Sequence, residues 1–143
     1  MRLESKGKKL GGILITHEHS DIFRGSVCSA GNTKFRFMRQ RGTIEGIKAY
    51  KGIGKMPEGL LKEVTVDQMF SIGNLDIRPF AISHDANEPS GFRIEHDGKS
   101  LAVATDLGIY DAYTVENLKG LDAICLRQTM MYICWKWEHT RII

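Results

Sequence analysis

The sequence predicts a single domain of the α/β (α+β) class, in which short strands alternate with a few helices. Three observations predict it. Short apolar runs rich in β-branched residues are bounded by turn residues. Two segments show the helical spacing of apolar side chains. An Asp-Gly dipeptide, at positions 97 and 98, joins two strand-like runs as in a β-hairpin. A chain of 143 residues is long enough for one domain with its own core.

The expected elements follow one another along the chain with little else between them. The first strand is predicted at residues 12–16, a run of Gly-Ile-Leu-Ile-Thr. Helices are predicted at residues 43–53 and 110–118 from the spacing of their apolar residues. Further strands are predicted at residues 64–66, 70–72, 75–82, 92–96, 101–104 and 121–126.

The composition excludes several classes of protein. Charged residues make up 26% of the chain and hydrophobic residues 42%, which is typical of a soluble globular protein. A net charge of +3 is too small to indicate nucleic-acid binding by itself. No apolar run reaches the roughly 18–20 residues of a membrane span, and the charged opening residues lack the core of a signal peptide. Three cysteines without paired spacing favour a reducing cytoplasm.

Two histidines and an aspartate follow the first predicted strand at close spacing. His17, His19 and Asp21 lie within five residues of one another, directly after an apolar run. Imidazole nitrogens and carboxylate oxygens suit zinc, manganese or iron. The alternative is a solvated polar loop, in which such a pattern arises by chance. The position at the end of a buried strand favours the metal site, because the strand fixes the backbone that carries the ligands.

Two more candidate ligands stand where later strands end. His84 follows the strand predicted at 75–82, and Asp106 follows the second arm of the hairpin. Taken alone, His84 is more often an ordinary loop histidine, and Asp106 is as readily a helix N-cap or turn residue. A carboxylate at the end of a buried strand is equally what a bridging metal ligand requires. His96 lies beside the hairpin turn and is expected to be exposed.

Three segments together resemble a known family. They read Ile-Leu-Ile-Thr-His-Glu-His-Ser-Asp (13–21), Ile-Ser-His-Asp-Ala-Asn-Glu-Pro (82–89) and Val-Ala-Thr-Asp-Leu-Gly (103–108). In order and spacing they resemble the successive metal motifs of the metallo-β-lactamase superfamily, and in wording its YycJ-like (WalJ) branch. The resemblance covers most of residues 8–21 and 43–126.

The resemblance implies a fold, a metal site and a reaction. The fold would be a partial αββα sandwich with two divalent ions, zinc or manganese, between its sheets. His17, His19 and His84 would hold the first ion, Asp21 the second, and Asp106 would bridge them, so that Asp21 and Asp106 are the expected catalytic carboxylates. A hydroxide activated by two metals would hydrolyse a phosphodiester in nucleic acid, as in an exonuclease. The resemblance of the motif residues to the YycJ-like branch disfavours β-lactam hydrolysis.

The sequence departs from the family pattern in two segments. The motif continues after Asp21 with a second histidine, where this chain has Ile22, and residues 23–41 show neither strand nor helix period. Restoring one base after the codon of Asp21, with suitable synonymous codons, returns that histidine and then a helix and a strand, Ile-Pro-Val-Tyr-Ala. One base restored before codon 127 gives the family's Glu-Ala-Asn-His-Asp. We therefore interpret residues 22–41 and 127–143 as translation out of frame.

This interpretation limits what the chain is expected to do. Cys28, Cys134, Trp135, Trp137 and His139 would be products of the wrong frame and carry no function. The N-terminal strands and the C-terminal part of the domain, with its last metal histidine, are expected to be absent. We expect at most one bound metal and negligible turnover. Two alternatives stay open: a non-catalytic binding or regulatory remnant without the second metal site, and a structural remnant with no selected role. Neither metal identity nor oligomeric state follows from the sequence.

Overall fold

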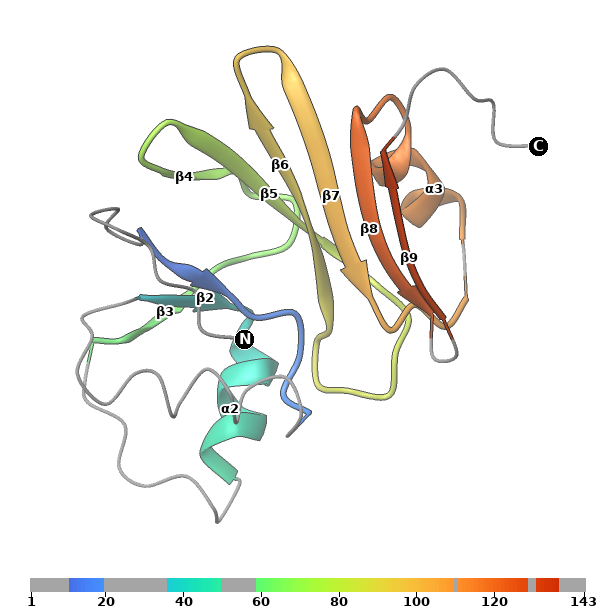
Figure 1. The fold of residues 1–143 in the computed structure, drawn as a ribbon. Helices are drawn as coiled ribbons and strands as arrows, with labels where there is room; N and C mark the ends of the chain where they lie inside the picture. Colours follow the sequence, from blue (N-terminus) through green and yellow to red (C-terminus); the bar gives the residue numbers. More distant parts are fainter. Residues whose placement is uncertain (1–10, 20–35, 50–58, 110, 129–130, 137–143) are drawn as a thin grey trace.

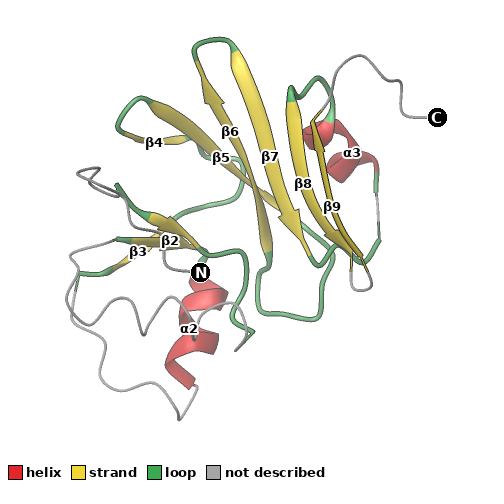
Figure 2. Ribbon diagram, viewed as in Figure 1, coloured by secondary structure: helices red, strands yellow, loops and turns green. Residues whose placement is uncertain are grey.

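The computed structural model describes residues 11–19, 36–49, 59–109, 111–128 and 131–136. Within these ranges the chain forms two β-sheets and two helices (Figures 1 and 2). Asp21, Ile22, Cys28, Trp137 and His139 lie outside the described residues, so the predictions that concern them are untested.

The smaller sheet contains three parallel strands in the order β1-β2-β3. These strands are β1 (Ile13–Leu14), β2 (Phe37–Arg39) and β3 (Leu61–Glu63). Helix α2 (Arg41–Ala49) lies between β2 and β3 in the sequence, as a crossover between parallel strands requires. The first predicted strand is thereby confirmed in part, and the first predicted helix begins two residues earlier than residue 43.

The larger sheet contains six strands in sequence order, from β4 to β9. Neighbouring strands are antiparallel except for β7 and β8, which are parallel and are connected through helix α3 (Ala112–Leu118). The strands are β4 (Phe70–Ile72), β5 (Leu75–Ala81), β6 (Ser90–His96), β7 (Lys99–Thr105), β8 (Ala123–Gln128) and β9 (Met131–Lys136). Five of them match strands predicted from the sequence, with ends shifted by at most two residues.

The predicted Asp-Gly hairpin connects β6 and β7. His96 pairs with Lys99 across the turn, which leaves Asp97 and Gly98 as the two loop residues. Both have left-handed backbones, with φ of 47° and 71°. This is the conformation of a type I′ turn, whose twist matches that of the strands it joins.

The two faces of the larger sheet pack against different neighbours. Ile77 and Phe92 face the smaller sheet, where they join Met38 and Val64 in one apolar cluster. Phe80 of β5 points to the other face of the sheet, where it forms a second cluster with Ala102 and Ala104 of β7 and with Leu118 of α3. Figure 1 shows the two sheets beside each other, with α2 at the smaller sheet and α3 at the larger one. This mixed arrangement confirms the predicted class, a partial αββα sandwich.

Three predictions about elements were wrong or incomplete. Residues 64–66 are not a strand: β3 ends at Glu63, and the backbone N–H of Val64 donates to the carbonyl of Arg39 at 2.9 Å just beyond it. Strand β2 lies in a segment where no period was found. Strand β9 lies in the tail, where no element was predicted.

One buried side chain in β2 is unusual for a sheet core. Arg39 is completely buried, and all three of its guanidinium nitrogens lack a hydrogen-bond partner in the described part of the chain. Burial disfavours the charged form and lowers the pKa of Arg39 from its ordinary value to about 10. Buried charges in folded proteins are normally paired, and among the residues that the structure describes this one is not.

Candidate metal centre

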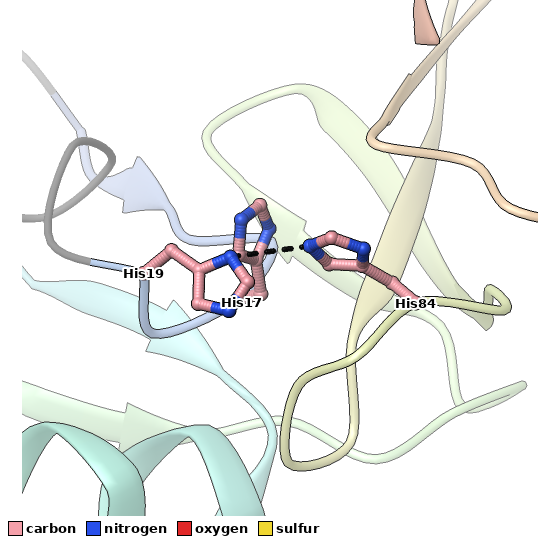
Figure 3. Close-up of side chains that lie close together, drawn as sticks. All are labelled: His17, His19 and His84. Atoms are coloured by element: carbon pink, nitrogen blue, oxygen red, sulfur yellow. Dashed lines mark hydrogen bonds between the residues drawn. The ribbon is translucent and has the colours of Figure 1, made fainter. Parts of the chain in front are cut away.

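Three histidine side chains converge at the junction of the two sheets. His17 and His19 follow β1 of the smaller sheet, and His84 follows β5 of the larger one. One ring nitrogen from each lies within 4.8 Å of the others, and the ring centroids are 4.7–4.9 Å apart. Figure 3 shows the three rings approaching one another from two separate loops.

The spacing of these nitrogens fits a divalent metal ion. Zinc binds imidazole nitrogen at about 2.0–2.1 Å in tetrahedral geometry, which puts two ligand nitrogens about 3.4 Å apart. His84 Nε2 and His19 Nδ1 are 3.2 Å apart. Three imidazole nitrogens also match the preference of zinc, copper, iron and nickel for this donor. The cluster therefore has the donor set and the spacing of a metal site.

Neighbouring polar groups fix the orientation of two of the three rings. His17 is 1% exposed, and its Nδ1 lies 3.0 Å from Thr16 Oγ1. Thr105 donates its hydroxyl to the same oxygen at 3.2 Å. His84 Nδ1 lies 3.1 Å from a carboxylate oxygen of Asp85. In the tautomer in which Nδ1–H donates to these oxygens, Nε2 of each ring keeps the lone pair that a metal needs.

Asp106 lies next to His17 but outside the group of three histidines. It is 6% exposed, and its Oδ2 is 3.6 Å from His17 Nε2. Its other oxygen, Oδ1, lies 3.3 Å from Nε of Arg127. The backbone of Asp106 is left-handed, with φ of 60°, a conformation uncommon outside glycine and typical of strained positions at functional sites. In this chain a guanidinium therefore faces the carboxylate that was predicted to bridge two metals.

The loops that carry His84 and Asp106 touch at a glycine. The backbone N–H of Gly108 donates to the carbonyl of Ser83 at 2.8 Å. A Cβ at position 108 would lie 3.0 Å from that carbonyl oxygen, closer than nine in ten real contacts of a Cβ. The absence of a side chain at Gly108 is what lets the two loops meet.

The structure brings together four of the five predicted site residues. His17, His19 and His84 form the cluster, Asp106 adjoins it, and Asp21 lies outside the described residues. Their roles as ligands stay predictions. Sequence reasoning missed Thr16 and Asp85 as orienting groups. Their positions, each beside a predicted ligand in the chain, were the available signal.

The remaining predicted histidine in the described ranges takes no part in the cluster. His96 lies at the hairpin turn with its side chain 38% exposed. Its Nδ1 lies 2.9 Å from the carbonyl oxygen of Asn74, and its Nε2 lies 3.2 Å from Asp97. It is a partly exposed turn histidine.

Comparison with known proteins finds one matching family and several similar proteins. Residues 1–142 match the family described as "Beta-lactamase superfamily domain". The chain is 31% identical over 121 residues to the exodeoxyribonuclease WalJ of Streptococcus pneumoniae, a match that spans 82% of this chain and 45% of WalJ. It is 29% identical over 112 residues to the exodeoxyribonuclease YycJ of Bacillus anthracis, across 78% of this chain and 40% of YycJ. The chain thus spans less than half the length of these relatives.

Solved structures show the same fold at low sequence identity. Zinc-bound PqqB from Methylobacterium extorquens superposes with a TM-score of 0.71 at 15% identity, over 84% of this chain and 48% of PqqB. The metallo-β-lactamase SMB-1 superposes with a TM-score of 0.61 at 17% identity, over 85% of this chain and 60% of SMB-1. No helix among the described residues is long and apolar enough to cross a membrane.

Proposed function

The chain belongs to the β-lactamase superfamily, whose fold implies divalent metal ions, and on that premise we propose that its histidine cluster is one half of a two-metal hydrolase site. The proposed reaction is exonuclease-like hydrolysis of phosphodiester bonds in nucleic acid. This chain by itself holds at most one metal ion and turns over negligibly. The convergence of His17, His19 and His84 is the observation that carries the proposal.

Each residue has a distinct role in this proposal. The three histidines would hold the first ion, Asp21 the second, and Asp106 would bridge the two. A pair of divalent ions supplies a water-derived nucleophile near neutral pH and neutralises charge on the phosphodiester oxygens. The protein's own part is to hold the ligands rigidly and to keep His17 in the buried environment described above.

The low activity proposed for this chain follows from the second half of the site. Position 22, where the family has a histidine, is isoleucine and offers no lone pair. Asp106 already has the guanidinium of Arg127 beside it, at 3.3 Å. A carboxylate held by an internal cation is a poor ligand for a second ion, because the two cations compete for the same oxygens.

The choice of nucleic acid as substrate is supported by the relatives. The curated proteins that match the chain are named exodeoxyribonucleases. Their fold hosts several chemistries, so the substrate class rests on sequence similarity and the metal site on geometry. A substrate assay must therefore be separate from a metal assay.

Metal counting tests the first half of the proposal. Equilibrium dialysis of the purified chain against Zn²⁺ or Mn²⁺ is expected to give one ion per chain and no second ion, and none in His84→Ala. His96→Ala, which removes a histidine outside the cluster, is the matched control and is expected to bind like the parent chain. A parent chain that binds no ion, or a His84→Ala variant that binds as well as the parent, overturns the proposed site.

A nuclease assay tests the second half. End-labelled single-stranded and double-stranded DNA, incubated with the metal-loaded chain, is expected to stay intact at background level. Hydrolysis that disappears in Asp106→Ala would show that a complete two-metal site forms in this chain after all.

The contact between Arg127 and Asp106 also favours a second candidate, a non-catalytic remnant that has lost the second metal site. The two candidates predict different coding sequences. We propose that residues 22–41 and 127–143 are read out of frame, and resequencing of codons 20–44 and 124–143 decides this directly. A base restored at each break indicates a longer two-metal hydrolase. Coding DNA that truly encodes Ile22 and the tail favours the remnant.

A further inference from the structure

The loop that carries His84 is attached to the first histidine motif by a carboxylate. Glu18 lies between His17 and His19 in the sequence, and its Oε1 accepts the backbone N–H of Asn87 at 2.7 Å. Asn87 belongs to the loop between β5 and β6, three residues after His84. The contact therefore joins the two loops that carry the three metal-ligand candidates.

The same loop is attached to the N-terminus of α2. Glu88 accepts the backbone N–H of Gly42 with Oε2 at 2.5 Å, in the first turn of the helix. The Thr43 hydroxyl donates to the carbonyl of Asn87 at 3.1 Å. Backbone N–H groups in a first turn have no partner inside the helix, and the positive end of the helix dipole favours a carboxylate. Glu88 therefore caps the helix from a loop distant in sequence.

Two glycines of α2 leave room for these carboxylates. A Cβ at Gly46 would lie 2.6 Å from Cγ of Glu18, and one at Gly42 would lie 2.9 Å from Cγ of Glu88. Glycine is otherwise unfavourable inside a helix, by about 1 kcal/mol relative to alanine. The helix is thus shaped to receive both side chains.

We propose that Glu18 is a positioning residue, which holds the His84 loop at the distance from His17 and His19 that a metal ion requires. The inference rests on the proposed metal centre and adds to it a residue outside the ligand set. Glu18 acts through the backbone of Asn87 and not by touching the ion. Without it, the loop would still be attached through Glu88 and α2, and through the backbone N–H of Ser90, which donates to the carbonyl of Thr16 at 2.9 Å. The contact at Asn87, which lies between His84 and these attachments, would be lost.

Zinc affinity tests the proposal, with Zn²⁺ alone as the probe and a chelating dye as competitor. Groups that orient metal ligands typically contribute 10–100-fold to metal affinity, so Glu18→Ala is expected to weaken binding about 10–100-fold. Glu18→Gln keeps an acceptor for the Asn87 N–H and is expected to restore most of the affinity. Glu45→Ala, on the exposed face of α2 and paired only with Arg41 among the contacts described, is the matched control.

Amide hydrogen exchange at Asn87 separates the outcomes. Faster exchange at Asn87 in Glu18→Ala, together with weaker zinc binding and rescue by Glu18→Gln, supports the proposal. Equal zinc affinity in the parent chain and Glu18→Ala overturns it while leaving the metal centre intact. A parent chain that binds no Zn²⁺ overturns both the proposed metal centre and the role of Glu18. Weakening that Glu18→Gln does not reverse overturns the role assigned to the hydrogen bond.

Discussion

The two sheets of this protein differ in how well their buried positions agree with their sequence. In the larger sheet, apolar side chains alternate along β5, β6 and β7, and each set packs on its own neighbour. In the smaller sheet, β2 is buried along its whole length and one of its three residues is an arginine without a partner in the described ranges. The contrast shows where sequence and fold support each other and where they conflict.

The proposed break in the reading frame explains why the two sheets differ. Strand β2 lies within residues 22–41, and the larger sheet from β4 to β7 lies outside both proposed segments. The reconstructed frame, Ile-Pro-Val-Tyr-Ala over residues 35–39, has alanine in place of Arg39. A small apolar residue is what a strand buried on both faces ordinarily contains. The buried guanidinium of Arg39 therefore supports the proposed frame break, and this support does not depend on the family motifs.

The largest effect is expected in the larger sheet. Phe80 is fully buried, and its ring lies over the paired glycine Gly91, where a Cβ would collide with it. Phe80→Ala removes the main side chain of the cluster beneath α3 and is expected to lower the free energy of unfolding by about 3–5 kcal/mol. Urea denaturation followed by circular dichroism measures it. Leu75→Ala, at an exposed position of the same strand, should have little effect. A small loss at Phe80 would mean that the cluster beneath α3 contributes little to stability.

An effect of opposite sign is expected in the smaller sheet. Arg39→Met keeps the length of the side chain and removes its charge, and replacing buried charges with apolar residues stabilises proteins by about 1–4 kcal/mol. The free energy of unfolding should rise on that scale, whereas Arg36→Met, at an exposed position before the same strand, should leave it nearly unchanged. A loss of stability in Arg39→Met would show that the guanidinium has a favourable environment and would remove this support for the frame break.

Comparison of Arg39→Met with the parent chain at different pH values tests the lowered pKa of Arg39. Burial lowers the pKa of Arg39 to about 10 in the folded chain, below its ordinary value in the unfolded chain, so above pH 10 the unfolded chain binds more protons. Stability contributed by this group therefore rises with pH above about 10. The difference in unfolding free energy between Arg39→Met and the parent chain should narrow as the pH is raised through that range. A difference that stays constant would contradict the lowered pKa.

A smaller effect is expected at the hairpin turn. Gly98 has a φ of 71°, and a Cβ there would meet no atom within 4 Å. Gly98→Ala should thus cost only the backbone strain of a left-handed alanine, about 1 kcal/mol. The thermal midpoint measures it, with Asp97→Asn as a control, because asparagine suits the first position of this turn. A much larger loss would show that the turn does more than set the register of β6 and β7.

The smallest effect is expected at the exposed start of β8. Asp122 accepts hydrogen bonds from the Lys99 ammonium at 2.7 Å and from the backbone N–H of Ser100 at 2.9 Å. The hydrogen bond from Lys99 is the main cause that lowers the pKa of Asp122. The stabilisation that these contacts of Asp122 provide is present above the ordinary pKa of the carboxyl group and is lost as the pH falls through the lowered pKa. Asp122→Asn should therefore differ from the parent chain near pH 6 and converge with it in acid. Urea titrations at both pH values test this.

The sequence predicted the elements whose pattern is local. The hairpin from 92 to 104 followed from alternation and Asp-Gly, and the placement of His17, His19 and His84 after strands followed from apolar runs that end in polar residues. Family motifs were needed to predict that these distant residues share one site, because spacing along the chain says nothing about contact between loops.

The failures have physical causes as well. Residues 64–66 have strand-forming side chains, but parallel pairing with β2 selects Leu61–Glu63, a choice made by tertiary contact and not by propensity. Strand β2 could not be predicted, since an arginine in a fully buried strand violates the pattern on which prediction depends. Glu18 and Glu88 were also missed as loop attachments, because their partners are backbone N–H groups with no sequence signal.

The origin of the three histidines in different sheets has a mechanical consequence. The described strands of the two sheets share no hydrogen-bonded neighbours, so apolar packing and loop contacts hold them together. An ion held by His17 and His19 from one sheet and His84 from the other would act as a cross-link between them. At a free concentration one hundred times the dissociation constant, such a ligand adds about 2.7 kcal/mol to stability. Removal of the ion by a chelator should then weaken the packing between the two sheets first, while the six-stranded sheet stays folded.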